Sequence, residues 1–260
     1  MSEFKFIDYQ VKHRVAEITM NRPPVNAINY EMARNVIDAY YKARDDKGVG
    51  AIILTSALNN AFSAGLDLKM ALNMTGQELR EFIEMFYYEM HEAQYRMGKP
   101  TIAAVNAAAM AAGVTWAVSC DIIIASEEAK FGYTEINVGL IPAMHVVHLP
   151  RQAGRHNAAK MLFTGDPVPA KEMWRMGVIN EVVSADQVMT TARRLARNLA
   201  GKSPLAMKLL RDSFMRTNDL DYRRAMESVV ETMCNLKDSD DSREALMAFV
   251  EHRDPVFKGK

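Results

Sequence analysis

The apolar and polar positions along the chain alternate between runs of strand period and runs of helix period. Ala16, Ile18 and Met20 share one face of an early strand, and residues 51–55 form an apolar run typical of a buried strand. Between them, residues 30–43 carry apolar side chains at helical spacing. A strand, a helix and a second strand in this order indicate an α/β core.

The alternation of strands and helices continues through the middle of the chain. A helix is predicted over about residues 76–97, where Gly98-Lys99-Pro100 ends it, and a strand follows at 101–105. A helix at about 111–119 and a strand at 122–125 extend the alternation. We therefore assign the chain to the α/β class.

The pattern changes near residue 184. Val188, Ala192, Leu195 and Leu199 fall on one helical face, and the sequence beyond them predicts helices and no further strand. We therefore divide the chain into a core of residues 1–195 and a helical segment of residues 196–260.

Composition narrows the class of protein. A chain of 260 residues, 49% hydrophobic, can bury one sizeable core. Its 32 basic and 32 acidic residues balance, so we expect no nucleic-acid or membrane partner. The chain has too few cysteines for a disulfide framework, and Cys120 lies in an apolar run, so we expect a reduced thiol. Residues 1–10 lack the apolar segment of a signal peptide, and we expect a cytoplasmic protein.

Two junctions between a strand and a small-residue turn are the candidates for chemistry. The strand at 101–105 runs into small residues at 111–113, where a ligand can approach the backbone closely. The first turn of the helix that follows has unpaired N–H groups and a partial positive charge. The strand at 51–55 leads into a similar turn at 61–68. Two such junctions offer two main-chain donors to an oxyanion.

These junctions carry a resemblance to a known family. Residues 62–68 (FSAGLDL) and 106–121 (NAAAMAAGVTWAVSCD) resemble the two signature segments of the enoyl-CoA hydratase/isomerase (crotonase) family. The resemblance implies a spiral of ββα units whose C-terminal helical segment packs against neighbouring subunits, in a homotrimer or in a hexamer of two trimers. It spans nearly the whole chain, and the further pieces that match in family order are residues 21–29, 120–121, 129–132, Glu135, 139–142, 149–151, 163–165 and 178–183.

The resemblance also implies the reaction centre. The substrate is an acyl-CoA thioester whose carbonyl oxygen gains negative charge as an enolate, and the backbone N–H groups of Leu66 and Ala112 align with the family's oxyanion donors. Coenzyme A is part of the substrate, so no separate cofactor and no metal are expected. Family members commonly carry three glycines at 111–113, where this chain has Ala-Ala-Gly. Alanine keeps the N–H and accepts helical φ/ψ, but its methyl group narrows the approach.

One glutamate of the family pattern is present and one is absent. Glu135 matches the second catalytic glutamate, and an apolar pocket would raise its pKa into a range useful for proton transfer. Thr115 stands where hydratases carry the first. Water addition generally needs two groups, whereas a 3-enoyl to 2-enoyl shift needs one base that removes and returns a proton. We predict an enoyl-CoA double-bond isomerase.

Three alternatives stay open. Within the family they are an enoyl-CoA hydratase and a C–C-cleaving or thioester-cleaving enzyme, each acting on an unusual acyl group. Outside enzymology, the alternative is an inactive relative that binds RNA or acts as a scaffold. His145 is a candidate contact of the acyl group, although a histidine in a loop can equally be hydrogen-bonded and passive, and His148 is a weaker candidate.

The remaining substrate contacts follow from the resemblance alone. A stretch after the first junction is expected to lie along the pantetheine and adenine of coenzyme A, and part of the C-terminal tail is expected to reach the nucleotide of a neighbouring subunit. Asp67 within that stretch is also suited to cap a helix. These predicted contacts are Ala64, Asp67, Leu68, Lys69, Phe257 and Lys258.

Overall fold

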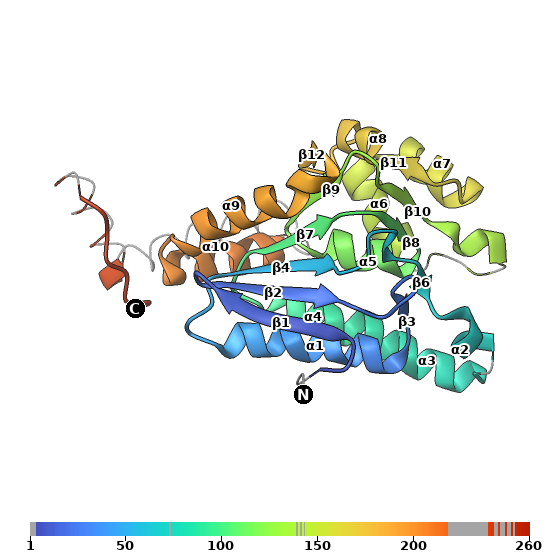
Figure 1. Ribbon diagram of the computed structural model, residues 1–260, viewed down its shortest axis with the longest axis horizontal. Coiled ribbons are helices and arrows are strands. Elements are labelled where there is room, and N and C mark those ends of the chain that lie inside the picture. The colour runs from blue at the N-terminus through green and yellow to red at the C-terminus, as the bar shows by residue number, and fades with distance from the viewer. Residues whose placement is uncertain are drawn as a thin grey trace.

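The fold is built on a six-stranded sheet (Figure 1). A computed structural model describes residues 4–72, 74–138, 140, 142 and 144–217, together with 239–241, 244, 248, 251 and 253–260. The first two strands are antiparallel, and all later neighbours are parallel. In spatial order the strands are β1 (Ile7–Lys12), β2 (Val15–Met20), β4 (Ala51–Ser56), β7 (Thr101–Val105), β9 (Ile122–Ser126) and β12 (Glu181–Val183).

Short strands form a second layer beside the main sheet. Each of the central strands β4, β7 and β9 is followed in the chain by a strand of this layer, so the chain repeats a ββα arrangement. A separate pair joins β3 (Ala27–Ile28) to β6 (Gly65–Leu66) in parallel. The second sheet has the order β11 (Val168–Pro169), β10 (Lys130–Gly132), β8 (Ala108–Met110) and β5 (Ala61–Ser63).

Helices cover both faces of the main sheet. Alternate residues of β4 point to opposite sides, so Ile52 and Leu54 join one apolar cluster and Ile53 joins the other. The larger cluster packs under α1 (Tyr30–Asp45), and the smaller one packs under α9 (Val188–Ala200) (Figure 1).

The other helices follow the strands that they cover. A continuous helical stretch comprises α3 (Gly76–Glu84), a π-helical segment η1 (Met85–Glu89) and α4 (Met90–Tyr95). The remaining helical elements are α2 (Leu68–Leu72), α5 (Ala112–Ser119), the 3-10 helix η2 (Thr134–Val138), α6 (His145–Ala153), α7 (Arg155–Thr164), α8 (Ala170–Arg175), the 3-10 helix η3 (Ala185–Gln187) and α10 (Pro204–Thr217).

The long elements match the sequence predictions, with a few exceptions. The strand β1 was not predicted, and the predicted helix over 76–97 contains the π-helical segment. The boundary that we expected between residues 195 and 196 falls inside α9, whose buried residues from Val188 to Ala200 face the sheet along the whole helix. The helical prediction for residues 218–238 lies outside the described residues, and it is wrong for residues 253–260, which form no helix. Instead, backbone N–H groups of this tail bond to the carboxylates of Asp241 and Glu244. Among the described helices, none combines the length and the apolar character needed to cross a bilayer.

Candidate active site

The candidate site lies where three strands of the second sheet end. Strands β8 and β10 are parallel with Met110 opposite Gly132, and β5 is parallel to β8 with Ser63 opposite Ala109. The carboxyl ends of parallel strands meet at one edge of a sheet. The residues that follow these strands, on β6, α5 and η2, are therefore gathered at that edge.

The structure brings the two predicted main-chain donors together. Ala112 is the first residue of α5, where a backbone N–H has no intrahelical acceptor. The N–H of Asp67 donates to the Ile28 carbonyl (2.9 Å), so the N–H of the preceding residue, Leu66, points to the other side of this extended strand. A β-carbon placed on Gly65 would lie 3.2 Å from the Ala112 nitrogen, so β6 and the start of α5 are in close contact.

The turn before α5 has a strained residue. Ala111 has φ 48° and ψ −122°, a conformation that suits glycine, and its N–H donates to the Gly132 carbonyl (2.7 Å). The expectation that the alanines of this turn take helical φ/ψ is right for Ala112 and wrong for Ala111, because Ala111 must turn the chain from β8 into the helix. Gly113 is needed for close approach, since a β-carbon there would lie 2.6 Å from the Ser63 carbonyl oxygen.

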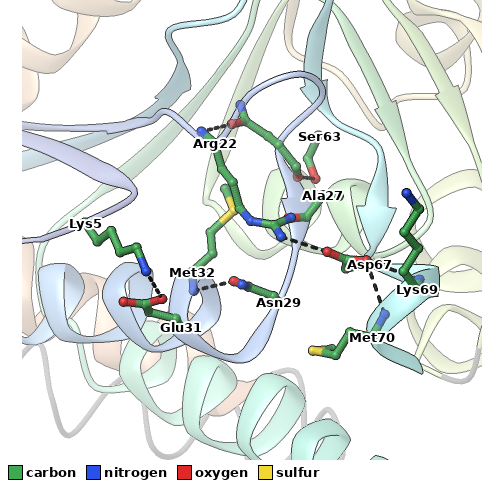
Figure 2. Close-up of polar contacts among 11 residues, drawn as sticks. Lys5, Arg22, Ala27, Asn29, Glu31, Met32, Ser63, Asp67, Lys69 and Met70 are labelled. Carbon is green, nitrogen blue, oxygen red and sulfur yellow. Dashed lines mark hydrogen bonds and ion pairs between the residues drawn. The ribbon is translucent and has the colours of Figure 1, made fainter. Parts of the chain in front are cut away.

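An ion pair fixes the segment that follows Leu66 (Figure 2). Arg22 donates through Nη2 to Asp67 Oδ2 (2.8 Å) and through Nη1 to the Ala27 carbonyl (2.5 Å). The other carboxylate oxygen of Asp67 accepts the N–H groups of Lys69 (3.2 Å) and Met70 (3.3 Å). Burial opposes the charged form, but these bonds hold the pKa of Asp67 below its ordinary value. Asp67 is thus a helix cap and an anchor of β6.

The other predicted contacts of coenzyme A divide into two groups. Ala64, Leu68 and Lys69 are exposed around Asp67, beside the Leu66 donor. Phe257 and Lys258 lie elsewhere: the Lys258 N–H donates to Asp241 (2.7 Å), in the part of the tail near the start of α10. In Figure 1 the C-terminal end lies on the opposite side of the molecule from β6 and α5. This chain therefore does not bring Phe257 and Lys258 to its own Leu66 and Ala112.

Glu135 sits on η2, shortly after β10, and its charge acts on two nearby tyrosines. Its side chain is half-buried, and its Oε2 atom has no hydrogen-bond partner among the described residues. Burial raises the pKa of Glu135 above its ordinary value. Burial and the nearby charge of Glu135 together raise the pKa of Tyr87 to about 12 and also raise the pKa of Tyr133. This environment favours a carboxyl group that can exchange a proton.

Thr115 is bonded to His145, and both side chains are almost fully buried. The Thr115 hydroxyl and His145 Nε2 are 2.9 Å apart, and each residue is only 1% exposed. The edge of one ring meets the face of the other between Tyr133 and His145, with centroids 4.4 Å apart. Burial, with a smaller contribution from His148, lowers the pKa of His145 to about 3, so the imidazole is uncharged near neutral pH.

A cavity of about 510 Å³ opens beside this pair. It runs between α4, α5, α6 and α10, and Thr115 and His145 line it together with His91, His148, Ser119 and Phe214. Along α5 the cavity wall continues from Thr115 to Ser119, toward the C-terminal end of the helix.

Sequence reasoning missed several residues of the site. Tyr87 comes from the π-helical segment, a feature often found at functional sites, and apolar periodicity does not reveal it. Tyr133 precedes Glu135 by only two residues, which was the available signal. The Arg22–Asp67 pair joins residues 45 positions apart, and the sequence offers no signal for such a contact.

Comparisons with known proteins agree with this geometry. The model of the enoyl-CoA hydratase/isomerase family matches residues 10–260. A carnitinyl-CoA dehydratase from Salmonella enteritidis PT4 is 33% identical over 251 residues, which cover 95% of this chain and 95% of the relative. An enoyl-CoA hydratase from Bacillus anthracis has a TM-score of 0.94 at 27% identity, over 98% of this chain and 100% of that chain. DspI from Pseudomonas aeruginosa has a TM-score of 0.94 at 28% identity, over 99% and 98%.

The chain belongs to the enoyl-CoA hydratase/isomerase family. The predicted fold class, a crotonase-like spiral of ββα units with C-terminal helices, is confirmed.

Proposed function

We propose that this protein is an acyl-CoA enzyme that shifts a double bond from the 3,4 to the 2,3 position. The thioester oxygen of the substrate binds between the N–H groups of Leu66 and Ala112, and Glu135 moves the proton. The observation that carries this proposal concerns the position where a hydratase would carry its first glutamate. Thr115 stands there, bonded to the neutral His145 (2.9 Å), so this position holds no carboxylate.

The proposed reaction balances with one base. The Glu135 carboxylate takes a proton from C2 of a 3-enoyl thioester, and the electron pair moves into the thioester carbonyl as a dienolate. The two N–H donors stabilise that charge by roughly 3–4 kcal/mol each. Glu135 then returns the proton to C4, and the double bond forms between C2 and C3. The raised pKa of Glu135 supports both halves of the cycle.

The proposal extends to the nucleotide and the assembly. The exposed residues Ala64, Leu68 and Lys69 would contact coenzyme A beside the anchored Asp67. In a homotrimer or a hexamer of two trimers, Phe257 and Lys258 would serve a neighbouring subunit. The buried free thiol of Cys120 and the balanced charge support a cytoplasmic protein without a nucleic-acid partner.

A second candidate is dehydration of a hydroxyacyl-CoA, or its reverse. The observation in its favour is the 33% identity to a carnitinyl-CoA dehydratase. Thr115 could orient a water molecule or a hydroxyl group through its own hydroxyl, although it is no base near neutral pH.

Substitution of Glu135 tests the proposal. Glu135→Gln keeps the shape and removes the basicity, so we expect isomerisation of a 3-enoyl-CoA to fall by about 10²-fold or more. The matched control is Glu128→Gln in the exposed turn between β9 and β10, which should keep full activity. Coupled absorbance assays on 3-enoyl-CoA and 2-enoyl-CoA report isomerisation and hydration separately. A Gln variant with near-normal turnover would refute the role of Glu135, and a parent that only hydrates crotonyl-CoA would establish the second candidate.

A further inference from the structure

The Thr115–His145 pair lies between the proposed thioester site and the neighbouring cavity. Thr115 follows Ala112 by three residues, which places it on the same face of α5, nearly one turn further along. Both members of the pair line the cavity of about 510 Å³. An acyl chain whose thioester oxygen is held at the Ala112 N–H, and which extends along α5 toward the cavity, would therefore meet the pair.

The pair has hydrogen-bonding capacity that the protein does not use. A neutral imidazole has one donor and one acceptor, and a hydroxyl has one donor and two acceptor positions. The bond between Thr115 and His145 Nε2 uses one position on each side. In the described part of the chain, His145 Nδ1 and the Tyr133 hydroxyl make no hydrogen bond of good geometry, although both are buried and the Ala111 backbone lies close to the imidazole. Buried polar groups are normally satisfied, and His145 lines the cavity, so a ligand in the cavity that bonds to the imidazole would gain affinity.

The charges around the pair favour an uncharged ligand group. Burial keeps His145 neutral. Asp121, also on the cavity wall, is paired with Arg211 at 2.7 Å. The wall beside the pair therefore presents dipoles and an internally balanced ion pair, and the exposed Arg151 also lines the cavity. A carboxylate or an ammonium group held at the pair itself would lose its hydration against a neutral imidazole and a hydroxyl.

We propose that Thr115 and His145 recognise an uncharged hydrogen-bonding substituent, a hydroxyl or a carbonyl, on the acyl chain beyond the reacting carbons. The natural substrate is then an oxygenated acyl-CoA thioester and not a plain hydrocarbon one. This inference rests on the proposed function, because it requires an acyl-CoA bound at Leu66 and Ala112.

Equilibrium binding of saturated thioesters tests the inference without turnover. Isothermal titration calorimetry would compare hexanoyl-CoA, 5-hydroxyhexanoyl-CoA, 5-oxohexanoyl-CoA and adipoyl-CoA, which have the same chain length. We expect the hydroxy or the oxo thioester to bind about 5- to 10-fold more tightly than hexanoyl-CoA, as one net hydrogen bond provides. Adipoyl-CoA should bind no better than hexanoyl-CoA.

Matched variants assign the preference to the pair. Thr115→Val removes the hydroxyl at nearly constant shape and should reduce the preference ratio to about one, whereas Thr115→Ser should retain it. His145→Gln can still bond Thr115 but lacks the Nδ1 group, so it should lose the part of the preference that Nδ1 provides. Circular dichroism checks that each variant is folded.

The outcomes separate this inference from the proposed function. Binding of hexanoyl-CoA as tight as that of the oxygenated thioesters, or tightest binding of adipoyl-CoA, would overturn the inference and leave the proposed function standing. A preference that survives Thr115→Val and His145→Gln unchanged would also overturn it. If none of the four thioesters binds, both fail.

Discussion

Ala111 is the residue whose backbone conformation fits its side chain least well. Its φ of 48° with ψ of −122° is a region that glycine adopts freely. Such strain costs of order 1–3 kcal/mol, and glycine loses about 0.4–1 kcal/mol through the entropy of the unfolded chain. We therefore expect Ala111→Gly to raise the free energy of unfolding by about 1 kcal/mol, measured by urea denaturation.

Ala112→Gly is the matched control for this prediction. Ala112 is already helical, so glycine should lower the free energy of unfolding by up to about 1 kcal/mol. Equal destabilisation by the two glycine variants would show that Ala111 is not strained.

Glu135 gives the reaction a predictable dependence on pH. Burial disfavours its charged form, so its pKa lies above the ordinary value of about 4.3. In the proposed reaction the base is the Glu135 carboxylate, and kcat/KM should therefore fall as the pH drops through this raised pKa. The same shift makes the contribution of Glu135 to stability greatest below its unfolded pKa and smaller as the pH rises through the folded one. A pH profile of kcat/KM whose acid limb lies at or below the ordinary pKa would contradict the assignment.

The residues of the site were predictable where they are tied to local motifs. Leu66, Ala112 and Glu135 were predicted because they stand in segments that resemble the family's motifs, and the structure gathers these segments. The bond between Thr115 and His145 joins residues 30 positions apart and depends on how α6 packs against α5. No local pattern encodes such a distance.

At the scale of elements, one buried arginine holds α10 to the core. Arg211 is 4% exposed, donates to Asp121 Oδ2 at 2.7 Å, and donates to the Gln94 carbonyl at 2.5 Å. Arg211→Met would leave Asp121 buried without its counter-ion, and we expect the free energy of unfolding to fall by about 3 kcal/mol. Chemical denaturation monitored by circular dichroism measures this loss.

The same helix offers a control for Arg211→Met. Lys208 pairs with Asp212 on the exposed side of α10, and Lys208→Met should change stability by no more than about 0.5 kcal/mol. If Arg211→Met lowers the free energy of unfolding as little as Lys208→Met does, the buried Arg211–Asp121 pair does not anchor α10. A large loss of stability in Arg211→Met would also loosen the packing of Phe214, which lines the cavity beside His145.

Elements were predictable in proportion to their length. The runs that became β4 and β7 are long enough for an apolar pattern, and α1 shows a clear amphipathic period. Strands of two or three residues, such as β6 and β8, carry no measurable period. They form because the main sheet places their neighbours beside them, so they depend on tertiary structure and not on local sequence.

At the scale of the whole molecule, an exposed aromatic side chain lies on a helix that contacts the segment of Glu135. Phe163 on α7 is 78% exposed and Trp174 on α8 is 50% exposed. Asn137, on the same 3-10 helix as Glu135, donates to the Gly165 carbonyl at the end of α7 (3.4 Å), so η2 rests against the helix that carries Phe163. A subunit contact on α7 would therefore also steady the segment that holds Glu135.

This arrangement predicts that assembly and activity fail together. We expect the protein to form a trimer or hexamer, and Phe163→Glu should release smaller species because a charge would replace an apolar side chain at the contact, whose burial is worth about 1.5–3 kcal/mol. Light scattering coupled to size-exclusion chromatography measures the mass, and kcat/KM should fall with it. The control is Val11→Glu on β1, another exposed apolar position, which should change neither quantity. A parent that is monomeric at micromolar concentration, or a Phe163→Glu variant of unchanged mass, would place the contact elsewhere. A variant that dissociates yet keeps full activity would show that Glu135 needs no support from a neighbour.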